Sequence, residues 1–165
     1  MEVRVLEPQD ADQCLSLRLE ALKTNPEAFA SSYEEESQSP VNKYNERLRS
    51  TTSLTFGAID NGQLIGMAGL MIETRLKLKH KATIISMYVK PEYRRSGIGK
   101  MLLLEAINKA KTFEGIEQIN LTVNAGNTAA KKLYTSLGFQ SYGTEIRSLK
   151  IDEIYYDEDY MVLFL

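Results

Sequence analysis

The feature that most constrains the fold is an apolar, β-type run from Ala82 to Val89 that is closed by Pro91 and followed by a glycine-rich turn. Residues 97–111 then carry apolar side chains at helical spacing, and a second strand-like run occupies 118–123. A strand, a helix and a further strand in this order predict a crossover that covers one face of a sheet. The remaining segments must be arranged around that sheet.

The flanking segments predict the rest of the sheet and its helices. The pair Asn61-Gly62 tolerates the positive φ angles of a type I′ turn, so it predicts a hairpin. The expected strands are 3–7, 54–59, 63–72, 139–149 and 155–165, the further helices are 11–24, 40–49 and 127–137, and 28–39 is expected to be loop. We therefore predict one α+β domain over 1–165, built on a single mixed sheet.

Composition excludes several classes of protein. The formal net charge is −2 and no run of like charges is long, which argues against a nucleic-acid partner. No stretch approaches the ~20 apolar residues of a membrane span, and the N-terminus is too polar for a signal peptide, so we expect a cytoplasmic protein with no membrane partner. One cysteine and one histidine exclude a disulfide framework and leave too few ligands for structural zinc. Cys14 lies on an apolar helix stripe and is expected to be inert, and His80 is expected in a loop.

The turn from Arg94 to Gly99 has the composition of an anion site. A helix N-terminus offers unpaired N–H groups and partial positive charge, and glycines allow close approach to the backbone. A P-loop would require glycine in place of Arg94 and Ser or Thr in place of Met101, and a dinucleotide fingerprint would require glycine in place of Leu102. A generic turn with exposed arginines remains the alternative from these residues alone.

Two motifs together resemble the GNAT superfamily of N-acetyltransferases. Its cofactor motif is met by Arg94-x-x-Gly97-x-Gly99, and its second signature by Asn127, Tyr134 and the pair Gly138-Phe139. The similarity covers about residues 84–139. It implies a three-layer α/β arrangement whose mixed sheet is splayed at its centre by a bulge, and it implies acetyl-CoA as the acetyl donor.

The resemblance also implies roles for individual residues. The pyrophosphate of coenzyme A would lie on Arg95, Ser96, Gly97, Ile98, Gly99 and Lys100, next to Arg94. Its pantetheine arm would run along the backbone of Met87, Tyr88 and Val89, where an N–H can stabilise the developing oxyanion. Asn127 would hydrogen-bond the arm, with Ala130 and Tyr134 on the same helix beside it.

Tyr134 is the implied catalytic residue, because it would donate a proton or a hydrogen bond to the leaving thiolate. A phenol pKa of about 10 against a thiol pKa of about 8.5 makes a hydrogen bond the safer role. From the residues alone, Tyr134 also fits a core tyrosine on the apolar helix face, and Asn127 fits a plain helix N-cap.

The general base is not evident from the sequence. Thr122 stands where some superfamily members carry a glutamate, and Ile84 to Ser86 offer none. Carboxylates from variable regions are the candidates, namely Glu34, Glu35 and Glu36 together with Asp157 and Glu158. Each also fits a solvated surface charge, but together they favour a cationic acceptor such as a polyamine or another small amine.

The sequence therefore predicts acetyl transfer to a primary amine, preferably a small molecule or polyamine, by direct attack in a ternary complex. Acetylation of a protein or peptide N-terminus and acyl-CoA sensing without catalysis are the alternatives. Dimers are common in the superfamily, but no stretch of this chain identifies an interface.

Overall fold

The computed structural model describes all of residues 1–165. Its strands form one seven-stranded mixed sheet. The strand order is β1-β2-β3-β4-β5-β7-β6. The strands are β1 (Glu2–Val5), β2 (Ser53–Asp60), β3 (Gln63–Ile72), β4 (Lys81–Val89), β5 (Gln118–Asn124), β6 (Gln140–Ile151) and β7 (Ile154–Phe164). Only β4 and β5 are parallel, which agrees with the predicted crossover between them.

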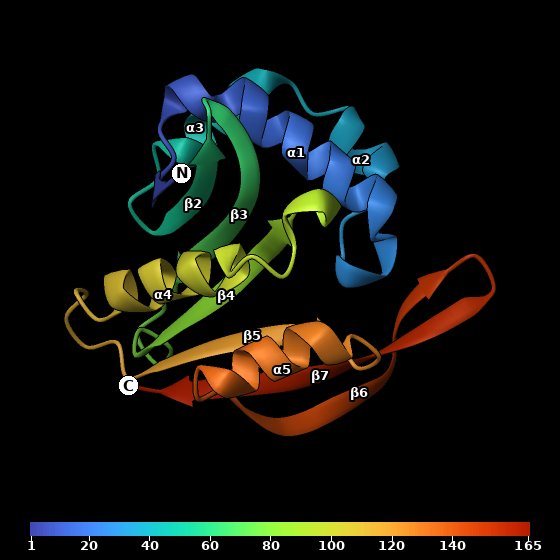
Figure 1. The fold of residues 1–165 in the computed structure, drawn as a ribbon. Coiled ribbons are helices and arrows are strands. Elements are labelled where there is room, and N and C mark those ends of the chain that lie inside the picture. The colour runs from blue at the N-terminus through green and yellow to red at the C-terminus, as the bar shows by residue number, and fades with distance from the viewer.

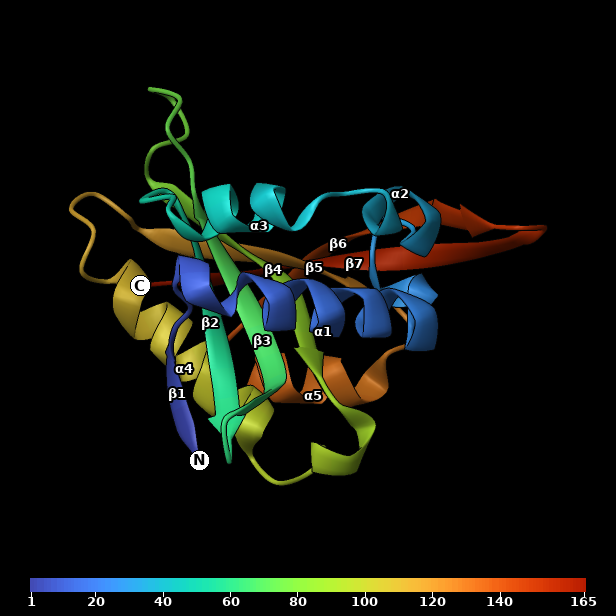
Figure 2. The same ribbon diagram turned by 90° about the horizontal axis from the view of Figure 1, so that it is seen from above.

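Helices cover both faces of the sheet, so the domain has three layers (Figures 1 and 2). On one face lie α1 (Ala11–Thr24), α2 (Tyr33–Ser37) and α3 (Val41–Leu48), and on the other lie α4 (Ile98–Ala110) and α5 (Thr128–Ser136). Short 3₁₀ turns are η1 (Pro8–Asp10), η2 (Pro26–Ala28) and η3 (Pro91–Tyr93). None of the helices has the length and apolarity needed to cross a membrane.

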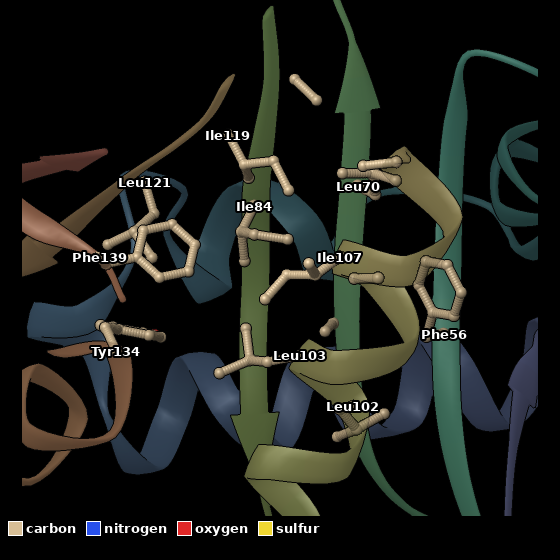
Figure 3. Packing of buried hydrophobic residues seen from close by; sticks show 14 of the residues in the cluster. Phe56, Leu70, Ile84, Leu102, Leu103, Ile107, Ile119, Leu121, Tyr134 and Phe139 are labelled. Carbon is tan, nitrogen blue, oxygen red and sulfur yellow. The ribbon is translucent and has the colours of Figure 1, made fainter. Parts of the chain in front are cut away.

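The hydrophobic core is divided by the sheet. The larger cluster of 20 buried residues joins α4 and α5 to the strands, with Leu103 and Ile107 above β4 and with Tyr134 and Phe139 near β5 (Figure 3). The smaller cluster of 10 buried residues joins α1 and α3 to the opposite face and includes Tyr88. The apolar helix stripes of the sequence therefore account for both layers.

One local prediction is confirmed and two are wrong. Asn61 and Gly62 have φ angles of 47° and 80°, as the type I′ hairpin requires. The stretch 28–39 is not all loop, because Ser32 and Glu35 form a capping box that starts α2. The N-cap of α3 is Pro40 rather than Ser39.

The sheet is splayed at its centre, as expected. Strands β4 and β5 pair only over Lys81–Thr83 and Gln118–Asn120, and beyond this point they diverge (Figure 1). A register shift between β3 and β4 accompanies a positive φ of 53° at Ser86. This is the signature of a β-bulge, which bends the strand and leaves backbone groups unpaired.

Candidate active site

The turn before α4 presents a row of free backbone N–H groups. The first helical hydrogen bond is donated by Met101 N to Gly97 O at 3.1 Å, and no backbone acceptor meets the N–H groups from Arg95 to Lys100. These groups and the helix dipole favour an anion at this place. The exposed side chains of Arg95 and Lys100 add positive charge.

The two glycines of this turn are required for different reasons. Gly97 is the N-cap of α4 with a φ of 87°, a conformation that other residues rarely adopt, and nothing crowds it. A Cβ atom on Gly99 would lie 3.2 Å from both Leu133 Cδ2 and Met87 Cε. Gly99 therefore allows α4 to pack closely against α5 and β4, in addition to any close approach by a ligand.

Arg94 is tied to the protein rather than extended toward solvent. Its Nε donates to Val89 O at 2.9 Å and its Nη2 donates to Asn25 Oδ1 at 2.8 Å. Its guanidinium also lies 5.5 Å from the ring centroid of Tyr88. Arg94 consequently braces the turn against the ends of β4 and α1; both arginines are exposed, but only the Arg95 guanidinium has no protein partner.

At the end of β4, some backbone N–H and C=O groups point into the gap where β4 and β5 diverge. Lys90 N donates to Ile65 O of β3 at 2.9 Å, and backbone groups alternate in direction along a strand. The groups of Met87 and Val89 therefore point away from β3. Because Val89 O accepts from Arg94, its N–H is the group left for a ligand. The Tyr88 side chain is on the other face, where its hydroxyl donates to Glu20 Oε1 at 3.1 Å.

Asn127 caps α5 and keeps one polar group free. Its Oδ1 accepts from Ala130 N at 3.1 Å, which confirms the predicted N-cap. Its Nδ2 donates to no protein group, so the same side chain can cap the helix and still donate to a ligand.

Tyr134 has a buried ring and a hydroxyl without a protein partner. The residue is 6% exposed, and its ring meets Phe139 edge to face with centroids 6.0 Å apart. Burial raises the pKa of Tyr134 to about 12. The hydroxyl oxygen of Tyr134 has no protein partner and is not fully buried, so it retains access to solvent.

A cavity of about 500 Å³ lies where β4 and β5 diverge, on the α1 side of the sheet. Ser86 and Thr122 line it from the two sides of the splay, and the other lining residues come from α1, α2, α3, β2, β3, β7 and residues 28–31. Its charged lining residues are Arg18, Glu36, Arg47 and Glu158. The cavity therefore has both positive and negative walls.

Only some of the carboxylates named as candidate bases line the cavity. Glu158 lines the cavity and accepts a hydrogen bond from Ser148 Oγ at 2.5 Å. Glu34 and Glu35 are exposed on α2, and Asp157 accepts from the backbone of Arg147, so none of these three lines the cavity. Solvated or structural charge is the better description of those three.

These observations agree with comparisons with known proteins. Residues 19–139 match the acetyltransferase (GNAT) family. The chain belongs to the GNAT family. GNAT acetyltransferases use acetyl-CoA, and the free amides of the turn, the Asn127 amide and the splayed β4 provide suitable polar groups for it.

Sequence relatives differ in their acceptors. The chain is 31% identical to a spermidine N(1)-acetyltransferase of Thermoplasma acidophilum, over 88% of this chain and 91% of the relative. It is 32% identical to an N-alpha-acetyltransferase of Mycobacterium tuberculosis, over 68% of each chain. The GNAT family is thus shown, whereas the acceptor is not.

Solved structures agree on the GNAT fold. A GNAT acetyltransferase from Streptococcus pneumoniae is 25% identical with a TM-score of 0.84 over 99% of both chains. A putative acetyltransferase from Salmonella typhimurium, solved with acetyl-CoA, is 19% identical with a TM-score of 0.82 over 99% of this chain and 93% of the other.

Sequence reasoning missed the two arginines of this GNAT cavity. Arg18 lies four residues after Cys14 on α1, so it is in phase with the apolar stripe of that helix. This spacing is the sequence feature from which the burial of Arg18 could have been predicted. Cys14 is buried, as expected, and lines the cavity as well; burial raises the pKa of its thiol to about 11, which disfavours the reactive thiolate.

Proposed function

We propose that this GNAT protein transfers the acetyl group of acetyl-CoA to the primary amine of a small molecule, by direct attack in a ternary complex. The observation that carries the proposal is the splay after Thr83 and Asn120, which parts β4 from β5 beside the cavity, at the strand that leads into the turn before α4. The thioester of acetyl-CoA supplies the carbonyl carbon that the amine attacks. A single domain over 1–165 would hold both substrates.

The residues that would hold acetyl-CoA follow from their free polar groups. The amides from Arg95 to Lys100 and the Arg95 guanidinium would bind the pyrophosphate. The N–H groups of Met87 and Val89 would bind the pantetheine arm and polarise the thioester carbonyl. The free Nδ2 of Asn127 would donate to the arm.

Tyr134 would stabilise the leaving thiolate by a hydrogen bond. With a pKa of about 12, complete proton transfer to a thiolate of pKa about 8.5 would be uphill by roughly 5 kcal/mol. A hydrogen bond needs no such transfer and is stronger when its acceptor is charged. The hydroxyl has no competing protein partner.

Glu158 is the carboxylate we favour for removing the proton of the acceptor ammonium. An alkylammonium has no lone pair and must lose a proton before it can attack. Glu158 lines the cavity from β7, opposite Asn124 of β5, and is only half-buried, whereas Glu36 is buried and accepts a hydrogen bond from Tyr44 at 2.7 Å. Thr122 lines the same space.

The acceptor class is the open part of the proposal. The spermidine N(1)-acetyltransferase relative supports a polyamine, and the N-alpha-acetyltransferase relative supports a peptide N-terminus. The acidic residues that favoured a polyamine contribute only Glu158 and Glu36 to the cavity, beside Arg18 and Arg47. A small amine of mixed charge fits this lining better than a polycation.

The test is release of the coenzyme A thiol from acetyl-CoA with pooled amines, polyamines and short peptides. We expect acceptor-dependent release with at least one small amine and a mass increase of one acetyl group on that amine. Measurable binding of coenzyme A without release on any acceptor would instead favour a sensor. Release confined to peptides would refute the small-molecule assignment.

A further inference from the structure

Arg18 is a buried arginine whose guanidinium meets no acceptor in the protein. The residue is 7% exposed, and its Nε and Nη1 atoms are fully buried without a hydrogen-bond partner. The carbon of the guanidinium lies 4.7 Å from the centroid of the Phe29 ring. The side chain lines the cavity, and Nη2, the one guanidinium nitrogen that is not fully enclosed, also has no hydrogen-bond partner, so it can meet a ligand there.

This arrangement is costly in the free protein. A guanidinium remains charged under ordinary conditions, and a buried charge without a hydrogen-bonding partner costs several kcal/mol. Burial accordingly lowers the pKa of Arg18. The contact with Phe29 offsets part of the penalty. A residue that costs stability and faces a cavity is better explained by a ligand that supplies the missing acceptor.

A second arginine strengthens the positive wall. Arg47 of α3 lines the cavity, with its guanidinium carbon 4.8 Å from the Tyr44 ring centroid. Glu36 forms no ion pair within 4.0 Å of either arginine and accepts a hydrogen bond from Tyr44 at 2.7 Å, although its charge partly counteracts the lowering of the Arg18 pKa. The other carboxylate, Glu158, comes from β7 on the far side of the splay. Positive charge is therefore available on the α1 and α3 wall.

We propose that the acetyl acceptor is a small primary amine that also carries a carboxylate, as an amino acid does, and that Arg18 and Arg47 bind this carboxylate. The inference rests on the proposed function and narrows its substrate class. The planar guanidinium matches a carboxylate in shape and charge. With its carboxylate held on α1 and α3, the acceptor can extend its amine toward Ser86 and Thr122, where β4 and β5 part.

Matched acceptors test this inference on the whole chain. Each free amino acid is compared with its amide and with the decarboxylated amine of the same side chain, at saturating acetyl-CoA. Loss of the charge leaves the guanidinium buried and unpaired, so kcat/KM should fall at least thirtyfold without the carboxylate. Equal use of an acid and its amide, or a preference for polyamines, would overturn the inference and leave the acetyltransferase function standing.

Variants assign the preference to Arg18. Arg18→Met should abolish the preference for carboxylated acceptors, and Arg18→Lys should restore part of it because the charge returns without the planar geometry. Arg49→Met is the matched control, since Arg49 is exposed at the C-cap of α3 and does not line the cavity. A preference retained by a folded Arg18→Met variant would refute the role of Arg18. If that variant does not fold, the neutral Arg18→Gln variant takes its place, and an unchanged preference there would refute the role of Arg18.

A binding measurement separates failure of this inference from failure of the proposed function. N-acetylated amino acids and their amides are titrated into the complex with coenzyme A, and the shift in Tm is recorded. If no amine is acetylated, the proposed function fails. A Tm rise with the acids alone, lost in Arg18→Met, would still support carboxylate binding. No rise with any of them in wild type would overturn the inference.

Discussion

Replacing Tyr134 by Phe removes a hydroxyl that makes no hydrogen bond within the free protein. The ring is buried against Phe139, but no protein group accepts a hydrogen bond from the oxygen. Its removal leaves no orphaned partner, and the apolar ring contacts remain. We expect the free energy of unfolding to change by less than about 1 kcal/mol, measured by urea titration.

The same substitution should lower the rate of acetyl transfer. A hydrogen bond to a charged acceptor contributes about 1.5–3 kcal/mol, which corresponds to roughly a 10- to 150-fold lower kcat. The Kd of coenzyme A should change far less, because the contact matters most when the sulfur is charged. Stopped-flow or steady-state release of thiol measures kcat, and calorimetry measures the Kd.

The pH profile tests how Tyr134 acts. Since burial raises its pKa to about 12, the hydroxyl should remain protonated and give no falling limb below pH ~11. Wild type and Tyr134→Phe should therefore have rate profiles of the same shape, with the variant lower throughout. An unchanged kcat would remove Tyr134 from the mechanism. A falling limb near pH 9 that disappears in the variant would refute the hydrogen-bond role and favour proton transfer.

Three further substitutions test the turn, its packing and the ion pair near the N-terminus. Arg95→Glu should raise the Kd of coenzyme A at least tenfold with an unchanged circular dichroism spectrum. Lys79→Glu makes an equal charge change in the exposed β3–β4 connection and should not raise this Kd. Equal Kd values for the two variants would mean that the turn does not bind phosphate. Gly99→Ala should change the free energy of unfolding by less than about 1 kcal/mol in urea titration, because its Cβ would meet only the flexible ends of Leu133 and Met87 at 3.2 Å and alanine favours the helix; a larger loss would show that these neighbours cannot shift. The hydrogen bond from Arg4 lowers the pKa of Asp10 below its ordinary value of 3.8, so the ionised carboxylate stabilises the fold above pH ~4 and stabilises it less as the pH falls. The difference in unfolding free energy between wild type and Asp10→Asn should therefore shrink on acidification. A constant difference would argue against the ion pair.

The parts of the fold and site that follow from the sequence are those encoded by neighbouring residues. The turn before α4, the cap at Asn127 and the hairpin at Asn61 each depend on a few consecutive residues whose backbone preferences are strong. The loop predicted for 28–39 shows the limit of this reasoning, because the reciprocal cap of Ser32 and Glu35 was not recognised.

The cavity could not be assembled from the sequence in this way. Its walls come from α1, α2, α3, β2, β3, β4, β5, β7 and residues 28–31, so its lining depends on the packing of distant segments. Glu34 and Glu36 illustrate the difficulty, since they are two residues apart on α2 and only Glu36 lines the cavity. Acidic composition near the site therefore suggested a polycationic acceptor without showing which carboxylates face it.

Arg18 shows what a stricter use of helical periodicity would have found. Cys14, Arg18 and Leu22 are spaced four residues apart on α1 and all three are buried. A charged residue in phase with an apolar stripe must find a partner inside the protein, reach water at its tip, or bind a ligand. The structure shows no protein partner for Arg18, and two of its nitrogens have no access to solvent. Its Nη2 is not enclosed and the side chain lines the cavity, so a ligand can supply the missing acceptor there, which makes Arg18 a better guide to the acceptor than the acidic segments.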